Sequence, residues 1–205
     1  MDIAKTLSLS FVMIAGPQIL SAIFLATTKK WLQNSLAFIA GAAVSVTAIT
    51  TLAFVFIHGV SNKSNSKHIG SWLILVLVTA AAIHKYLTRK QSKPPEWMGK
   101  LEEENPKGSF RLGFLLLGVF PSDILTSISV GSLIASQQHA WVQILPFVLL
   151  VVLFLALPMI LILIFGKRAE AFLPKARDWM NKNSWIVSEI VFALFIVLMI
   201  NNIRS

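Results

Sequence analysis

Six long apolar runs dominate the sequence and restrict it to one class of fold. They extend over residues 7–26, 36–57, 69–83, 112–135, 140–165 and 185–203. Most of them reach the roughly 20 residues that a helix needs to cross a bilayer. The hydrocarbon offers no water to pair with backbone N–H and C=O groups, and the runs lack the alternation of barrel strands. We therefore predict an all-α polytopic membrane protein with six transmembrane helices.

The composition agrees with a bilayer as the solvent of the chain. Of its 205 residues, 56% are hydrophobic and only 13% are charged, a balance too apolar for a soluble domain of this length. The chain has no cysteine, which excludes disulfides, thiolate metal sites and a thiol relay. No two of the four histidines share a helix at metal-ligand spacing. We expect neither a bound metal nor another cofactor.

The basic residues divide unequally between the two sides of a six-helix topology. Of the 18 Lys and Arg residues, only Lys5, Lys63, Lys67 and Arg204 fall on one side. The positive-inside rule makes the richer side cytoplasmic, so we expect a multi-pass protein of the inner (cell) membrane with both termini outside. Short basic loops beside anionic headgroups also explain the net charge of +9, so membrane lipids, and not nucleic acid, are the expected partners.

The runs group into two halves of three. Residues 1–87 form the first predicted three-helix repeat, residues 88–109 a cytoplasmic linker rich in proline and acidic residues, and residues 110–205 the second repeat. Three is an odd number, so the second half must enter the membrane from the opposite side. The sequence therefore predicts two inverted repeats.

Two proline-containing segments match at corresponding positions, in the first and the fourth run. Each proline lies about ten residues into its run, or roughly 15 Å, near the middle of the bilayer. A proline there begins a new helical segment whose first N–H groups are bare, and two such ends present partial positive charge to an anionic group. A plain kink is the alternative for each proline. The candidate substrate- or ion-binding residues are Pro17, Gln18 and Ser21 in the first segment and Pro121, Ser122, Asp123 and Thr126 in the second.

Asp123 is the one carboxylate that the run boundaries place deep in the membrane. An intramembrane acid is costly and usually takes part in ion or proton handling, which makes Asp123 a candidate proton carrier. The alternative is structural, because Asp123 falls in the first turn after Pro121 and could act only as a dipole partner or cap. Glu189 lies close to the predicted cytoplasmic face, where an interfacial role is the simpler expectation.

Two other segments have interpretations that the sequence leaves open. The small residues of 36–48 favour close helix packing, centrally or in a dimer, while Ser45, Thr47, Thr50 and Thr51 could instead line a substrate path. In the loop 166–183, Phe172, Leu173, Trp179 and Met180 alternate with basic residues, so the loop is expected to lie along the inner interface. Ordinary anchoring is the simpler role for this loop, and a specific lipid-headgroup site is the other.

Several of these motifs resemble the lysine exporter superfamily. They are the broken first run followed by Lys29 and Lys30, the Ala-Phe-Ile-Ala-Gly of residues 37–41, and the Gly-Val-Phe-Pro-Ser-Asp of residues 118–123. The basic loop around Trp179, followed by a last apolar run, is similar to the group called GAP or sulfolipid-addressing proteins. The resemblance implies six helices in two inverted triplets and a chain that can pair as a homodimer. It also implies export or delivery of lipids, glycolipids or small polar solutes. Phe120-Pro121 stands where the superfamily often has Asn-Pro, so the substrate does not carry over.

The leading functional hypothesis is a secondary transporter, an exporter that uses both breaks as its site and Asp123 for proton coupling. The alternative is a non-transporting accessory subunit of a larger lipid-export or lipid-synthesis machine, with 166–183 as its docking surface. An enzyme is not expected, because the buried set has one acid and no nucleophile with a partnered base.

Overall fold

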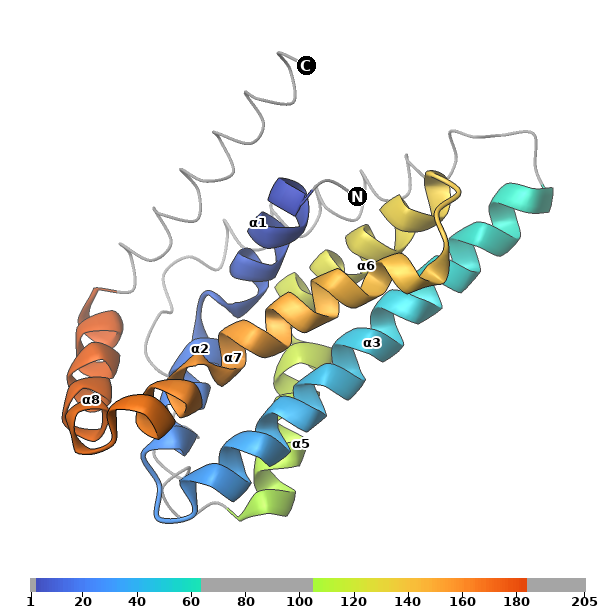
Figure 1. The fold of residues 1–205 in the computed structure, drawn as a ribbon. Coiled ribbons are helices and arrows are strands. Elements are labelled where there is room, and N and C mark those ends of the chain that lie inside the picture. Colours follow the sequence, from blue (N-terminus) through green and yellow to red (C-terminus); the bar gives the residue numbers. More distant parts are fainter. Residues whose placement is uncertain (1–2, 64–104, 184–205) are drawn as a thin grey trace.

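The computed structural model describes residues 3–63 and 105–183 (Figure 1). Every element in these two ranges is helical, as predicted. The elements are α1 (Ile3–Ile14), α2 (Pro17–Ala26), α3 (Trp31–Lys63), α5 (Pro106–Val119), α6 (Pro121–Ser136), the 3-10 helix η2 (Trp141–Ile144), α7 (Leu145–Phe165) and α8 (Lys167–Lys182). The predicted third and sixth membrane helices, residues 88–104 of the predicted linker, and Glu189 lie outside the described residues.

Two helical stretches are long and apolar enough to cross a membrane. They are Trp31–Gly59 within α3 and Trp141–Phe165, which joins η2 to α7. The pair α5 and α6 passes the same test as one span that is bent by 69° at its break. Such helices make the chain a membrane protein. The count of six spans remains a prediction.

Neighbouring elements of the two halves run in opposite directions. In Figure 1, α1 and α2 descend, whereas α5 and α6 rise, and α3 and α7 are likewise opposed. Helix α5 begins at Pro106, inside the predicted linker 88–109, because Asn105 caps it and accepts a hydrogen bond of 3.0 Å from the Gly108 N–H. Proline at the first helical position is favoured, since its missing N–H has no partner there anyway.

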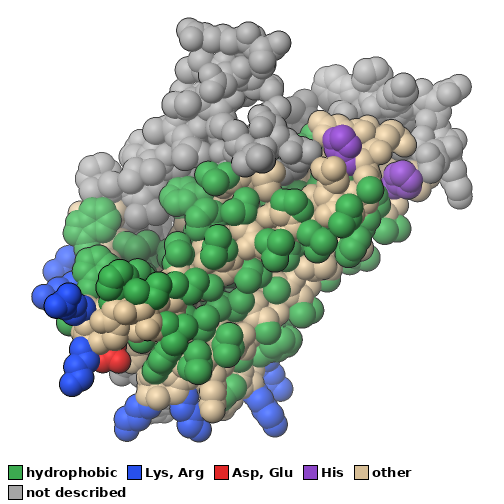
Figure 2. All heavy atoms as spheres, in the orientation of Figure 1, with side chains coloured by type: hydrophobic (Ala, Val, Ile, Leu, Met, Phe, Trp, Pro, Cys, Tyr) green, Lys and Arg blue, Asp and Glu red, His purple; other side chains and the backbone are tan. Residues whose placement is uncertain are grey.

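Basic side chains gather at one end of the described molecule (Figure 2). On the face seen in Figure 2, Lys and Arg side chains gather at the lower left end, and His side chains lie at the opposite end. The surface between them is largely hydrophobic. We call the Lys- and Arg-rich end the basic end. It carries α8, the start of α3 and the start of α5 (Figure 1).

Glycines let α3 approach the broken pair α5 and α6 very closely. A Cβ atom on Gly41 would collide with the Phe110 carbonyl oxygen, and one on Gly113 would collide with the Phe38 carbonyl oxygen. The contact is therefore reciprocal, backbone against backbone. Small residues permit this proximity in membrane helices. The finding confirms close packing as a use of the small-residue segment 36–48.

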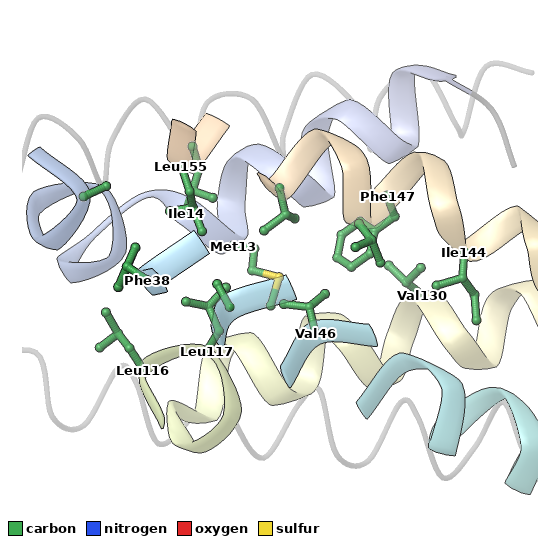
Figure 3. Packing of buried hydrophobic residues seen from close by; sticks show 14 of the residues in the cluster. Met13, Ile14, Phe38, Val46, Leu116, Leu117, Val130, Ile144, Phe147 and Leu155 are labelled. Carbon is green, nitrogen blue, oxygen red and sulfur yellow. The ribbon is translucent and has the colours of Figure 1, made fainter. Parts of the chain in front are cut away.

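An apolar core closes around the level at which both helices break. Met13 and Ile14 from the end of α1 and Leu117 from the end of α5 are all less than 5% exposed. They meet Phe38 of α3 and Phe147 of α7 in the same cluster (Figure 3). The apolar core therefore extends up to both breaks.

Candidate functional site

The first break depends on Gly16. Helix α1 ends at Ile14 and α2 begins at Pro17, while Gly16 has φ 147° and ψ −141°. That region of backbone conformation is nearly restricted to glycine, because a Cβ atom would clash there. Pro17 then suits the first position of the new helix. Glycine turns the chain at this break, and proline starts the next helix.

The second break has a different origin. Helix α5 ends at Val119, and Phe120 is extended with φ −67° and ψ 123° before α6 begins at Pro121. A residue that precedes proline is pushed out of the helical region by the proline ring, which accounts for this conformation. The Phe120 carbonyl oxygen then accepts hydrogen bonds from the N–H groups of Asp123 and Ile124, at 3.0 and 3.1 Å.

Gln18 and Asp123 join the two broken helices. The Gln18 Nε2 group donates a hydrogen bond to Oδ2 of Asp123. Gln18 is 2% exposed and Asp123 is 1% exposed, so the bond is shielded from solvent. Each residue lies in the first turn after its proline, so the side chains from the two half-helix starts meet. The Ser122 hydroxyl donates to the other carboxylate oxygen, Oδ1, at 3.2 Å.

The Asp123 carboxylate occupies the place that the sequence assigned to an anionic ligand. A carboxylate in the first turn of a helix is stabilised by the partial positive charge of that helix start. Here it also accepts a hydrogen bond from the first turn of α2. The protein thus supplies its own carboxyl group where the side chains of the two half-helix starts meet.

Gln18 leaves an acceptor beside this carboxylate. Its Oε1 atom is buried and has no hydrogen-bond partner among the described residues. Leaving a buried acceptor unpaired costs about 1–3 kcal/mol, so a donor brought by a ligand or a proton would be stabilised there. The amide therefore offers one donor that is used and one acceptor that is open.

The other predicted site residues are placed less centrally. Ser21 donates to the Pro17 carbonyl oxygen at 2.7 Å, and Thr126 donates to the Ser122 carbonyl oxygen at 2.8 Å. Both hydroxyl hydrogens are therefore used inside their own helices. Pro121 is exposed, so its ring faces outward although it sets the break. The structure brings together Gln18, Ser122 and Asp123, and leaves the rest around them.

The buried hydroxyl of Ser127 was not identified in the sequence analysis, and the role of Ser45 was not decided there. Ser127 is fully buried, and its Oγ has no partner among the described residues. Its position four residues after Asp123 places it on the same helix face, a signal that was available in the sequence. The sequence indicates Ser45 only as one of several residues that could line a path. In the structure Ser45 is 1% exposed, and its Oγ abuts Gly118, three residues before Pro121.

A model of one protein family matches almost the whole chain. The family is described as Sap, sulfolipid-1-addressing protein, and the match covers residues 6–202. The chain belongs to this family. No curated protein and no solved structure matches the chain. Membership of the wider lysine exporter superfamily stays a prediction.

The region shared with the Sap family includes both breaks and all of α8. The site described above is therefore part of the matched region. Within residues 3–63 and 105–183, this Sap-family chain has no group of three or more His, Cys, Asp or Glu side chains that could hold a metal. The chemistry that the described site offers is hydrogen bonding between a buried amide and a buried carboxyl group.

Proposed function

We propose that the chain is an inner-membrane secondary transporter that exports a lipid, a glycolipid or a small polar solute. The observation that carries this proposal is the buried hydrogen bond between Gln18 and Asp123, which connects two discontinuous helices. Discontinuous helices at corresponding positions of two halves are the usual location of a transporter's binding site. The name of the Sap family, which refers to the addressing of a sulfolipid, favours a lipid-linked substrate.

The proposed arrangement is two inverted triplets with both termini outside, in a chain that can also pair as a homodimer. The opposite directions of α3 and α7, and of the two broken pairs, support the inverted arrangement. In such a transporter one half rocks against the other about a central site. The bond between Gln18 and Asp123 is placed to form in one state and open in another.

Proton coupling through Asp123 is supported by the donor and the acceptor group of the Gln18 amide. An ionised carboxylate only accepts hydrogen bonds, whereas a protonated one also donates. Gln18 Nε2 serves the ionised form, and the open Oε1 atom can accept from the protonated form. If the amide turns over between the two states, it can pair with either form, so the acid keeps a hydrogen-bond partner when it loads or releases a proton.

Flux through proteoliposomes tests the proposal. Purified protein is reconstituted with and without a pH gradient, and the movement of labelled phospholipid, glycolipid, amino acid and monovalent cation is compared. We expect flux of a lipid-linked substrate that responds to the gradient. If none of these probes binds and none is moved, the chain is not a transporter of the proposed classes.

The second candidate function is an accessory subunit that carries no substrate itself. It is favoured by the exposed aromatic side chains of α8, because Phe172 is 60% exposed and Trp179 is 51% exposed. This alternative expects co-purification with a large partner and full function after replacement of Pro17 or Asp123. Neither candidate function includes an enzymatic reaction.

A further inference from the structure

The inner face of α8 is fastened to the membrane-spanning part of the chain. Ala169 and Leu173 are 5% and 2% exposed and pack with Ile23 and Ala26 of α2 and Ile162 of α7. The Arg177 guanidinium lies 4.6 Å from the centre of the Phe24 ring, a cation-π contact with α2. Helix α8 is therefore a fixed element, with one face committed to α2 and α7.

The free side of α8 carries basic and aromatic residues in a regular alternation. Arg168, Phe172, Lys175, Trp179 and Lys182 follow one another at spacings of four, three, four and three residues, and all five are exposed. Residues at these spacings fall along one side of a helix. The two rings alternate with the three cations along that side. We call these five residues the α8 outer stripe.

The position of the α8 outer stripe matches the headgroup level of a bilayer. Helix α7 is a candidate membrane span and ends at Phe165, and α8 begins two residues later, after Gly166 with φ 52°. Leu163, Ile164 and Phe165 at the end of α7 are all more than half exposed, as lipid-facing residues would be. A helix that starts there enters the interface, where tryptophan rings and basic side chains are favoured.

The charge of the α8 outer stripe is not neutralised within the described part of the chain. Asp178 is paired with Arg177, at 3.2 Å between Oδ1 and Nε. Arg168, Lys175 and Lys182 have no ion pair among the described residues, and Lys167 beside them is also exposed. Three cations without an acidic partner, next to two exposed rings, complement a surface that is anionic at its phosphates and apolar just beneath them.

We propose that the α8 outer stripe is a binding site for anionic phospholipid headgroups, in the leaflet at which the basic end of the protein lies. Phe172 and Trp179 enter the acyl boundary, while Arg168, Lys175 and Lys182 contact the phosphates. This lipid site is separate from the proposed transport site at Gln18 and Asp123. Helix α8 packs on α2, and α2 carries Gln18. Lipid bound to the α8 outer stripe is therefore attached to one of the two helices that the bond between Gln18 and Asp123 connects.

Lipid binding to the full chain in detergent tests this site. Short-chain phosphatidylglycerol and phosphatidylcholine are titrated separately, and bound lipid is counted by native mass spectrometry. The variant R168Q/K175Q/K182Q is compared with K29Q/K30Q/K107Q, which removes as many charges from the same end but none from α8. Each basic residue near an anionic surface contributes about 1 kcal/mol, so we expect the α8 variant to bind phosphatidylglycerol at least about tenfold more weakly.

The control variant is expected to keep wild-type affinity, and phosphatidylcholine binding should be weak and unchanged in both. Replacing Phe172 and Trp179 by serine should weaken both lipids, because the rings act through the acyl boundary. Equal losses in the α8 and control variants would overturn the proposal. So would unchanged lipid binding by the α8 variant together with loss of a co-purifying protein, which would make the stripe a protein-docking surface.

Discussion

The amide nitrogen of Gln18 donates to the carboxylate of Asp123 across 105 residues of sequence and between two helices that are both broken. Both partners are almost completely buried. Losing one partner of a buried hydrogen bond leaves the other unpaired, and the loss is larger when the carboxyl group is ionised. The pair therefore serves as a structural link, and it is also the centre of the proposed transport site.

Removing the charge of Asp123 separates these two roles. The Asp123→Asn replacement keeps the size of the side chain and its oxygen acceptor but cannot bind and release a proton. We expect flux in proteoliposomes to fall about tenfold or more and to lose its response to a pH gradient. A factor of this size is usual when the binding of one ligand, here the proton, is coupled to the binding of another, here the substrate. Asp178→Asn, which alters an exposed carboxylate on α8, is the matched control. Full, gradient-dependent flux with only a lower melting temperature would rule out proton coupling through Asp123.

A double-mutant cycle measures the link itself. Gln18→Leu and Asp123→Ala are made singly and together, and the free energy of unfolding is measured for each. The bond is buried, and it involves a carboxyl group that strengthens it when ionised, so we expect a coupling energy of about 1–3 kcal/mol, above the roughly 0.6 kcal/mol average for hydrogen bonds between membrane helices. Effects that add within about 0.5 kcal/mol would show that the two side chains do not stabilise each other.

The glycine contact between α3 and α5 can be tested with a control in the same helix. A methyl group on Gly41 or Gly113 would meet backbone atoms that cannot rotate away. Either alanine replacement should therefore force the helices apart and lower the free energy of unfolding by about 3 kcal/mol or more, at the upper end of overpacking costs. Nothing lies within 4 Å of a Cβ on Gly59, so Gly59→Ala should be neutral or stabilising by up to about 1 kcal/mol. Well-folded Gly41→Ala protein would contradict the close approach.

The first break should be more sensitive to Gly16 than to Pro17. Gly16→Ala places a Cβ in a backbone region that only glycine adopts readily, at a cost of about 1–3 kcal/mol. Pro17→Ala keeps a residue that is compatible with the first turn, so its cost should be below about 1 kcal/mol. Thermal unfolding of both variants decides the order. A larger loss for Pro17→Ala would mean that the proline, and not the glycine, holds the break.

The attachment of α8 depends on Arg177 and Phe24. Replacing Arg177 by Gln removes the cation beside the ring, and replacing Phe24 by Leu removes the ring while keeping an apolar side chain. Each change should destabilise the docking of α8 by about 0.5–2 kcal/mol, the range for cation-π pairs. Limited proteolysis within residues 167–182 reports the loosening. The control is Lys175→Gln, which removes one positive charge from the free side of α8 and should leave the cleavage rate unchanged.

The class of the protein and the location of its breaks follow from local sequence. Apolar runs of membrane length permit only helices in a bilayer, and prolines at matching depths in residues 7–26 and 112–135 mark the points at which α2 and α6 begin. The alternating aromatic and basic residues of 166–183 predict an interfacial segment. They do not predict that it is one helix, because Pro174 within it is a typical helix breaker.

Which polar groups meet depends on the tertiary fold. The pairing of Gln18 with Asp123 requires α2 and α6 to be held near each other by α3, against which both helices pack, and no local pattern records that distance. In the sequence Gly16 is only the neighbour of a proline, and its positive φ becomes apparent in the folded backbone. Burial likewise separates Asp123, which is enclosed, from Pro121, which faces outward two residues earlier. Local sequence decides where a helix can start and stop, but contacts between distant helices arise from packing.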